Sequence, residues 1–279
     1  MRFVRIGLLT LLATACTSIE RMVLPNPVLL DERWARAAPP PGATVDHRPW
    51  DELLGRYLAM DATGANRFNY GAVTSQDRAT LQEYLRRLQK VNVEALTRTQ
   101  QLAYWINLYN AQTVALILAN YPVRSIREIN GGLLSFGPWE REVVTVVGEN
   151  LSLNDIEHRI IRPVFGEPRI HYALNCAAVG CPNMAPQAWR ADGIKSALVA
   201  AEHAYVNDPR GVNIDEQGRL TLSKIYAWFR EDFGDSEADV IARLARVAEP
   251  ALRAQLQGRT SVDHYQYNWA LNDRPLGPE

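Results

Sequence analysis

Two cysteines and a histidine lie close together between residues 169 and 182, and they are the strongest candidates for chemistry in this sequence. His171 precedes Cys176 by five residues, and Cys181 follows Cys176 by another five. Two interpretations stay open: the thiols form a structural disulfide in an oxidising compartment, or Cys176 is a nucleophile. If Asn175 caps a following helical turn, Cys176 would lie at its positive N-terminus, where thiol pKa values fall.

A nucleophilic thiol needs a base, and two histidines are candidates for that role. His158 follows Asp155 by one helical turn in a predicted helix, so that a carboxylate could orient the imidazole ring. His171 shares the face of a predicted strand with Asn175, although either ring could equally be a structural hydrogen-bonder. The other three histidines are expected in a solvated tether, on a surface helix and near the last strand: His47, His203 and His264.

A zinc site is a third possible use of the same residues. It would combine His171, Cys176 and Cys181 with a fourth ligand such as His158, but this spacing is not a usual zinc pattern. The sequence also lacks a glycine-rich phosphate loop, a G-x-S-x-G elbow and an H-E-x-x-H helix. We therefore expect no metal and no cofactor, and neither a nucleotide-dependent enzyme nor an α/β-hydrolase.

Two asparagines stand out in the most apolar predicted helix, which runs from Thr99 to Asn120. A buried amide without hydrogen-bond partners costs about 1 to 3 kcal/mol, so something should satisfy Asn107 and Asn110. Either the neighbouring backbone does so, or the two side chains line the pocket of Cys176 and bind substrate or an oxyanion. In both cases we expect the amides to be hydrogen-bonded in the interior.

The pattern of apolar residues predicts helices interleaved with short strands. Helical spacing of apolar residues predicts a helix around residues 81–88, and the helix 99–120 is apolar enough to be central. Asn154 and Glu157 fit a capping box that opens a short helix, with Asp155 and His158 on its polar face. Alternating or turn-bounded segments predict strands or hairpins over residues 143–153, 170–174, 212–222 and 265–271. Without a regular βαβ order, we predict an α+β fold: one mixed domain with a central buried helix and a mainly antiparallel sheet.

The N-terminal residues have the order of a secretory signal. Two arginines flank the start of an apolar run over residues 6–12, and small residues then lead to Cys16. The segment Leu12-Ala-Thr-Ala-Cys16 resembles the lipobox of bacterial lipoproteins, and the absence of an acidic residue after Cys16 favours delivery to the outer membrane. We predict a signal peptide over residues 1–15, lipidation of Cys16 and a location on the periplasmic face of the cell envelope. A cleaved, unlipidated signal is the alternative.

Proline content and charge complete the predicted organisation. Six prolines and Gly42 between residues 16 and 49 predict an extended tether, with one folded domain over residues 50–279. Lysine and arginine number 30 against 31 acidic residues, so no net positive field would attract a phosphate backbone. We expect the membrane, through the lipid anchor, and a peptide or small-molecule substrate as partners, and no nucleic acid.

Four segments in order resemble the DUF547 family of proteins of unknown function. They are Tyr104-Trp-Ile-Asn-Leu-Tyr-Asn110, Leu151-Ser-Leu-Asn-Asp-Ile-Glu-His158, Arg169 to Pro182 and Tyr267-Asn-Trp-Ala-Leu-Asn272. Some plant members resemble fusions to glutaredoxin-like domains, which implies thiol chemistry. The fold is expected to be loosely similar to transglutaminases or papain-type thiol proteases.

Two functional hypotheses follow. The first is a thiol-dependent hydrolase or transferase acting on an amide or acyl bond in the cell envelope, with Cys176 as nucleophile and His158 or His171 as base. In it, Asn107, Asn110 or Asn175 orients the reacting groups. A redox carrier is a variant of this hypothesis, although C-x4-C is not the usual C-x-x-C spacing. The second is a non-catalytic envelope binding protein in which Cys176 and Cys181 form a permanent disulfide.

Overall fold

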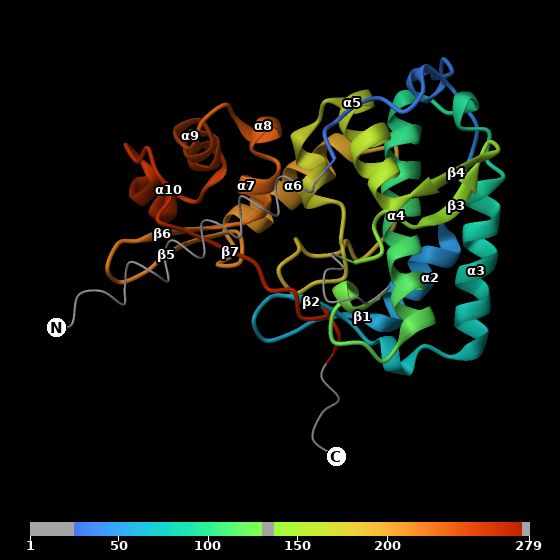
Figure 1. The fold of residues 1–279 in the computed structure, drawn as a ribbon, viewed down its shortest axis with the longest axis horizontal. Coiled ribbons are helices and arrows are strands. Elements are labelled where there is room, and N and C mark those ends of the chain that lie inside the picture. Colours follow the sequence, from blue (N-terminus) through green and yellow to red (C-terminus); the bar gives the residue numbers. More distant parts are fainter. Residues whose placement is uncertain (1–24, 130–136, 275–279) are drawn as a thin grey trace. The chain divides into compact units, whose positions relative to one another are not determined.

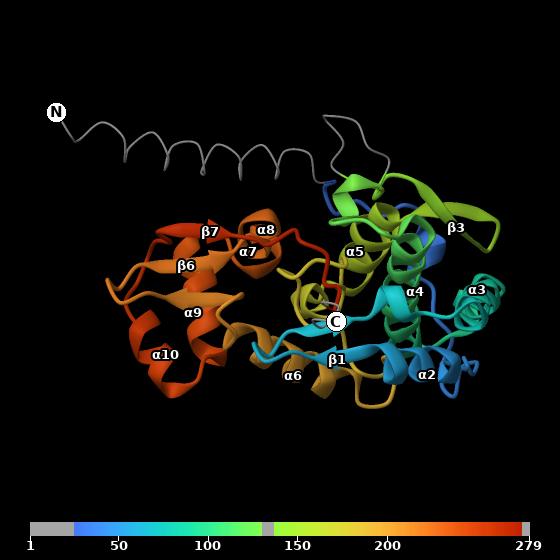
Figure 2. The same ribbon diagram turned by 90° about the horizontal axis from the view of Figure 1, so that it is seen from below.

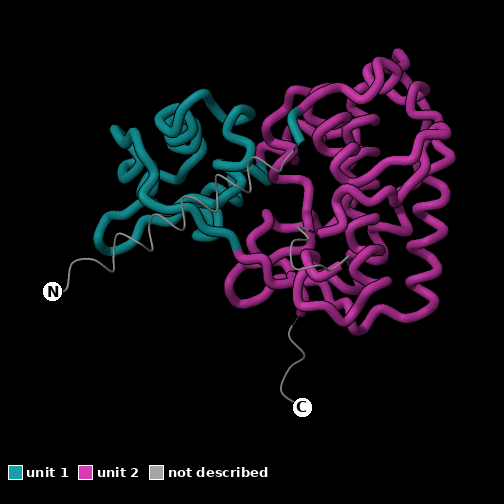
Figure 3. The backbone as a smooth tube through the Cα atoms, in the orientation of Figure 1, with its two compact units in different colours: residues 1–26, 200–267 teal, residues 27–199, 268–279 magenta. Residues whose placement is uncertain are grey.

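The structure is a computed structural model, and it describes residues 25–129 and 137–274. The backbone packs as two compact units (Figure 3). The larger unit comprises residues 27–199 and the C-terminal residues from Asn268, and the smaller unit comprises residues 200–267 with residues 25–26. The predicted signal peptide and Cys16 lie outside the described residues. None of the helices in the described part of the chain is both long enough and apolar enough to cross a membrane.

Helices dominate the larger unit, with two small two-stranded sheets (Figure 1). Its α-helices are α2 (Arg48–Tyr57), α3 (Ser75–Gln89), α4 (Arg98–Asn120), α5 (Arg162–Phe165) and the start of α6 (Ile194–Val206), in which the boundary between the units falls. Its strands are β1 (Leu58–Met60), β2 (Asn66–Phe68), β3 (Glu142–Val146) and β4 (Glu149–Ser152). The short 3-10 and π turns are η1 (Glu32–Ala35), η2 (Tyr70–Ala72), η3 (Val93–Ala95), η4 (Ile126–Glu128), η5 (Asp155–Ile161) and η6 (Pro168–Tyr172).

Helix α4 is the centre of the larger unit. It begins at a reciprocal capping box between Thr97 and Gln100, which satisfies two of the amide groups that every helix start leaves open. Its residues are buried on every side from Gln101 to Ala111, and α3 and η5 pack against it (Figures 1 and 2). The predicted central buried helix is therefore confirmed, and so is the predicted helix that becomes α3.

The packed chain starts earlier than predicted. Trp34 is only 2% exposed and meets Trp105 of α4 edge to face, with ring centroids 5.4 Å apart. Backbone bonds from Ala38 to Leu96 and from Ala43 to Ala95 tie the following segment to η3, at 2.9 Å each. The predicted start of the packed chain near residue 50 is therefore too late. The segment from about residue 31 is largely extended, as predicted, but the buried ring of Trp34 and these backbone bonds dock it onto the larger unit.

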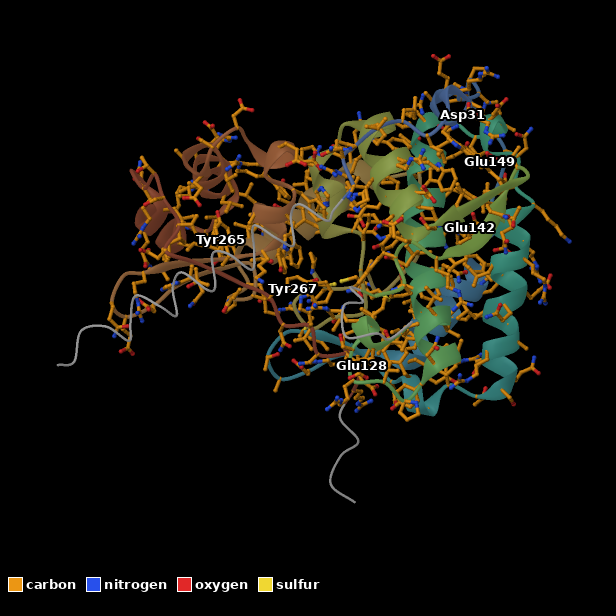
Figure 4. The ribbon with its side chains drawn as sticks, in the orientation of Figure 1. Asp31, Glu128, Glu142, Glu149, Tyr265 and Tyr267 are labelled. Carbon is orange, nitrogen blue, oxygen red and sulfur yellow. The ribbon has the colours of Figure 1, made fainter. Side chains whose placement is uncertain are left out.

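The docked segment also reaches the β3–β4 hairpin. Arg33 forms an ion pair with Glu149 of β4 at 3.1 Å, and Figure 4 shows Asp31 and Glu149 at the same end of the unit. The hairpin agrees with the predicted strands, and its register pairs Val146 with Glu149. Val147 and Gly148 form the turn with φ angles of 50° and 80°, the left-handed conformation that tight hairpin turns require.

The helix after this hairpin differs from the predicted one. Its cap is Ser152, whose hydroxyl accepts from the Asp155 amide at 3.0 Å while the Asp155 carboxylate accepts from the Ser152 amide at 2.9 Å. Asn154 makes no cap, which corrects the prediction of an Asn154–Glu157 box. Residues 155–161 form a π-helix, whose wider turn changes which side chains share a face. Glu157 and His158 are both buried as a result.

The segment 170–174 is not the predicted strand. It belongs largely to η6, a 3-10 helix from Pro168 to Tyr172. The alternation of apolar side chains that suggested a strand was misleading, because His171 and Ala173 are as buried as the apolar residues between which they lie. With burial on all sides, the sequence pattern carries no information about two opposite faces.

The smaller unit joins a three-stranded sheet to short helices. Its strands are β5 (Val212–Ile214), β6 (Leu220–Ser223) and β7 (His264–Gln266), and its helices besides the end of α6 are α7 (Ile225–Trp228), α8 (Arg230–Phe233), α9 (Glu237–Val247) and α10 (Pro250–Leu256). β5 and β6 form the predicted hairpin, and β7 pairs with β6 in parallel. The predicted last strand, residues 265–271, is shorter because β7 ends at Gln266. Helices with small, mainly antiparallel sheets confirm the α+β class.

The histidines outside the candidate site are placed as follows. His203 and His264 are exposed, as expected for a surface helix and an edge strand. His47 is not solvated: it is 6% exposed, and its Nδ1 lies 2.7 Å from the hydroxyl of Tyr84. Asn107 lies beside the same ring. The correction has the same cause as that for Trp34, since residues 31–49 pack onto the larger unit.

Candidate functional site

Cys176 and Cys181 face each other across a short loop in the larger unit. Their sulfur atoms lie 2.7 Å apart, and the structure has them as thiols rather than as a disulfide. Cys181 is buried, whereas Cys176 is partly exposed. The backbone amide of Cys176 also donates to the sulfur of Cys181 at 3.1 Å. The pair is therefore asymmetric, with one accessible sulfur and one protected sulfur that holds a backbone hydrogen bond.

The loop that carries the pair, residues 175–182, is shaped by Asn175. Its carboxamide oxygen accepts from the amide of Ala177 at 2.9 Å, and its amide group donates to the carbonyl of Pro182 at 2.9 Å. The first contact is an Asx turn, and the second joins the two ends of the loop. No helix follows Cys176, so the prediction that Asn175 caps a helical turn is wrong. Asn175 instead holds the loop closed, and Ala177 adopts a φ of 60° within it.

The C-terminal segment 268–272 lies along the same loop. The amides of Val179 and Gly180 donate to the carbonyls of Ala270 and Asn268 at 2.9 and 2.8 Å. The amide of Asn272 donates to the carbonyl of Ala177 at 2.9 Å, and Ala178 forms a bridge with Leu271. One of the four segments that resemble DUF547 thus supports another that lies about ninety residues earlier in the chain.

The two asparagines of α4 bind backbone, as one of the two sequence interpretations proposed. Asn110 accepts from the amide of Asn175 at 2.8 Å and donates to the carbonyl of Ala173 at 2.9 Å. Asn107 makes the same two-point contact with Trp189, at 2.9 and 2.8 Å. The prediction of interior hydrogen bonds is confirmed, and it is Asn110 that positions the start of the cysteine loop. A role of either amide in binding substrate stays a prediction.

We expect Asn110→Leu to destabilise the protein by about 1 to 3 kcal/mol, because it leaves the Asn175 amide and the Ala173 carbonyl buried without their partner. Asn107→Leu should cost a similar amount, since it makes an equivalent contact with Trp189. Only the Asn110 variant should also change the alkylation rate of Cys176. Chemical unfolding and thiol labelling of both variants measure this, and equal effects on Cys176 would contradict a positioning role for Asn110.

A buried carboxylate lies between the two candidate histidines. Oε1 of Glu157 is 3.6 Å from Nδ1 of His171, and Tyr109 donates a hydrogen bond to the same carboxylate. Burial raises the pKa of Glu157, but the positive charge of His158 and the hydrogen bonds from His171 and Tyr109 outweigh it and lower that pKa to about 2. Glu157 is therefore ionised at neutral pH and is the anion of the site.

Two buried tyrosines, Tyr109 and Tyr70, lie within electrostatic range of the two thiols. Burial raises the pKa of Tyr109 well above 10, and negative charge at Glu157 and Cys176 raises it further. Burial, the charge of Asp273 and charge on the two sulfurs likewise raise the pKa of Tyr70. The Tyr70 hydroxyl donates to the side-chain oxygen of Asn272 at 2.9 Å. The thiol pair thus lies within electrostatic reach of two buried phenols, and Tyr109 connects it to Glu157.

Asp155, the carboxylate predicted to orient His158, does not have that role. Asp155 accepts from Ser152 and pairs with Arg159 at 3.0 Å, on the outer side of the π-helix. The carboxylate close to His158 is Glu157, and Nη1 of Arg162 lies 3.4 Å from Nδ1 of the same ring. Sequence reasoning assigned Glu157 to a helix cap. A charged residue between isoleucines at 156 and 160 was the signal that it lies in the interior.

The structure groups the residues expected at the site into two sets. Cys176, Cys181 and Asn175 share the loop that Asn110 anchors, and His158 and His171 lie beside Glu157. Asn107 belongs to a neighbouring contact with Trp189 and His47. In residues 25–129 and 137–274, no group of three or more histidine, cysteine, aspartate or glutamate side chains is placed to hold a metal ion.

Comparison with known proteins gives one result. Residues 93–206 match the family model described as protein of unknown function, DUF547. No curated protein and no solved structure matches, and the expected likeness to transglutaminase or papain-type folds stays a prediction. The matched region contains α4, the π-helix with Glu157 and the cysteine loop. The similarity to the DUF547 family therefore covers residues 93–206, which include the cysteine loop, Glu157 and both candidate histidines.

Proposed function

We propose that this protein is a thiol-dependent hydrolase or transferase that acts on an amide or acyl bond, with Cys176 as its nucleophile. The observation that supports this best is the partly exposed sulfur of Cys176, 2.7 Å from a second, buried sulfur. A thiol beside a thiolate can donate a hydrogen bond to it and stabilise its charged form, so Cys181 would favour ionisation of Cys176. Cys181 is in this view the nearest activating group of Cys176.

The chemistry would proceed through a thioester. The thiolate of Cys176 attacks the carbonyl carbon of the substrate, the bond to the amine or alkoxide breaks, and the leaving group departs with a proton. Water then attacks the thioester in a hydrolase, or an amine attacks it in a transferase, and the Cys176 thiol is restored. His158 and His171 remain the proposed bases. The ionised Glu157 would stabilise either ring in its protonated form, as the third member of a nucleophile, base and orienter set does.

The test uses the purified protein, reduced first and labelled with iodoacetamide between pH 5 and 9. Cys176 should alkylate at pH 7 faster than a free cysteine, whose pKa is about 8.5, and Cys181→Ala should slow that reaction. Incubation with p-nitrophenyl acetate should leave an acetyl thioester on Cys176, detected by peptide mass mapping, and none in Cys176→Ala. His158→Ala and His171→Ala identify the base through the pH profile of acylation.

Two outcomes would contradict the proposal. Alkylation of Cys176 no faster than that of a free cysteine would mean that the site does not activate the thiol. If Cys176 and Cys181 react with iodoacetamide only after the protein is unfolded in reductant, the second hypothesis is favoured, a non-catalytic binding protein with a permanent Cys176–Cys181 bridge.

We also propose that the protein is anchored at the periplasmic face of the bacterial outer membrane by a lipid on Cys16. The support is the sequence of residues 1–16, with its arginines, short apolar run and lipobox-like end. A membrane-bound enzyme of this kind would meet peptides or small acyl compounds of the cell envelope.

A further inference from the structure

We infer that Cys176 and Cys181 also act as a reversible dithiol pair that exchanges with disulfides, an activity beyond acyl or amide chemistry at the same site. The inference rests on the proposed function in one respect, because it needs Cys176 to be a reactive thiol. It adds a second role for Cys181, which the proposed function uses only as an activating neighbour.

The first argument is the asymmetry of the pair. A thiol that attacks an external disulfide must be accessible, and the thiol that resolves the resulting mixed disulfide must be close to it and protected from other reactions. Cys176 is partly exposed and Cys181 is 3% exposed. Cys181 also accepts a hydrogen bond from the Cys176 amide at 3.1 Å, which would stabilise its thiolate once Cys176 is held in the mixed disulfide. The two residues thus meet the requirements of an attacking and a resolving thiol.

The second argument is that the loop brings the two sulfurs together through hydrogen bonds of its own. They lie 2.7 Å apart, and a disulfide of about 2.05 Å needs them to approach by only about 0.7 Å. Asn175 and the segment 268–272 hold the loop through contacts that do not involve either sulfur. Because the loop is kept in shape by these contacts, it does not need a permanent covalent bridge, and the bond can form and break in the folded protein.

The exchange is balanced as follows. The Cys176 thiolate attacks one sulfur of a substrate disulfide, forms a mixed disulfide and releases the other sulfur as a thiolate. The Cys181 thiolate then attacks the Cys176 sulfur and releases the second substrate thiolate. The substrate disulfide gains two electrons and the pair loses two, leaving a Cys176–Cys181 disulfide and two protons lost from the pair. A thiol such as reduced glutathione reverses both steps.

The experiment uses the Cys16→Ser protein, so that only the two loop thiols report, together with the same protein carrying Cys181→Ser or Cys176→Ser. Each is reduced, freed of reductant and incubated with oxidised glutathione, and the products are mapped by mass spectrometry. We expect a Cys176–Cys181 disulfide with release of two glutathione molecules in the parent. Cys181→Ser should retain a glutathione mixed disulfide on Cys176, and Cys176→Ser should remain unmodified. Reduced glutathione should restore the parent thiols without unfolding, as followed by tryptophan fluorescence.

The outcomes separate the two proposals. If Cys176 alkylates and acylates as proposed but the parent forms no intramolecular disulfide, this inference fails and the proposed function stands. If the disulfide forms but is reduced only after unfolding, the bridge is structural and the inference also fails. A glutathione adduct on Cys181 in Cys176→Ser would overturn the assignment of attacking and resolving thiols. If Cys176 reacts with neither iodoacetamide nor oxidised glutathione, both proposals fail. Should Cys181→Ser not fold, Cys181→Ala replaces it.

Discussion

Glu157→Gln should destabilise the protein by about 3 to 5 kcal/mol, the cost of removing one partner from a buried charged group. Glu157 is 8% exposed, its carboxylate accepts from Tyr109, and its Oε1 lies 3.6 Å from Nδ1 of His171. The amide keeps the shape of the side chain but removes the charge that these groups face. Denaturant unfolding at pH 7 measures the loss directly.

The matched control is Glu142→Gln, since Glu142 is an exposed glutamate on β3 (Figure 4). Its free energy of unfolding should stay within about 0.5 kcal/mol of the wild type. The double variant Glu157→Gln with His171→Gln should lose less than the sum of the single changes, because each removes the partner of the other. A Glu157→Gln protein as stable as the control would show that no ionised carboxylate is held at this position.

Acidification from pH 7 to pH 4 should destabilise the protein through His47 by up to about 3 kcal/mol. Burial lowers the pKa of His47, and the charge of Arg190 lowers it further, to about 4 against an ordinary value of 6.5. Above pH 6.5 the ring is neutral in both states and contributes no pH dependence. Between pH 6.5 and 4 the unfolded chain binds a proton that the folded chain does not, so the free energy of unfolding falls as the pH falls.

The effect of His47 is isolated by His47→Asn, which keeps a polar atom near the Tyr84 hydroxyl and cannot titrate. Its free energy of unfolding should fall by about 3 kcal/mol less than that of the wild type between pH 7 and 4. His264→Asn, at an exposed histidine, should follow the wild-type profile. Glu157 acts in a different pH range. Its lowered pKa stabilises the folded protein at neutral pH, and this stabilisation is lost between about pH 4.5 and 2 as the carboxylate takes up a proton. Parallel profiles for His47→Asn and the wild type would mean that folding does not lower the pKa of His47.

Local pattern was sufficient for several elements of the fold. The apolar periodicity of α3 and α4 and the turn of the β3–β4 hairpin depend on residues within a few positions of one another, so they could be predicted. The same holds for the interior asparagines of α4, because an amide in an apolar helix must find a partner wherever the helix lies. The sequence around His203 and His264 was also sufficient to predict a surface helix for the first and a position near the last strand for the second.

Local pattern failed where a residue's partner lies far away in the chain. Trp34 and His47 lie in the proline-rich segment that was predicted to be a tether. In the structure Trp34 packs against Trp105, and His47 lies beside the Tyr84 hydroxyl. Segment 170–174 alternates like a strand, but it is buried on all sides. The predicted Asn154 cap depended on helical spacing, which a π-helix does not keep.

The sequence by itself determined the set of chemical groups: two thiols five residues apart, two histidines nearby and two amides in a central helix. Only the tertiary structure decided how they are used, because the contacts that hold them join distant segments. Asn110 accepts from the backbone amide of Asn175, 65 residues later, and Asn272 donates to the side-chain oxygen of Asn175 from 97 residues beyond it. Glu157, rather than Asp155, became the buried anion because the wider turn of the π-helix directs it inward, where burial and its neighbours set its charge.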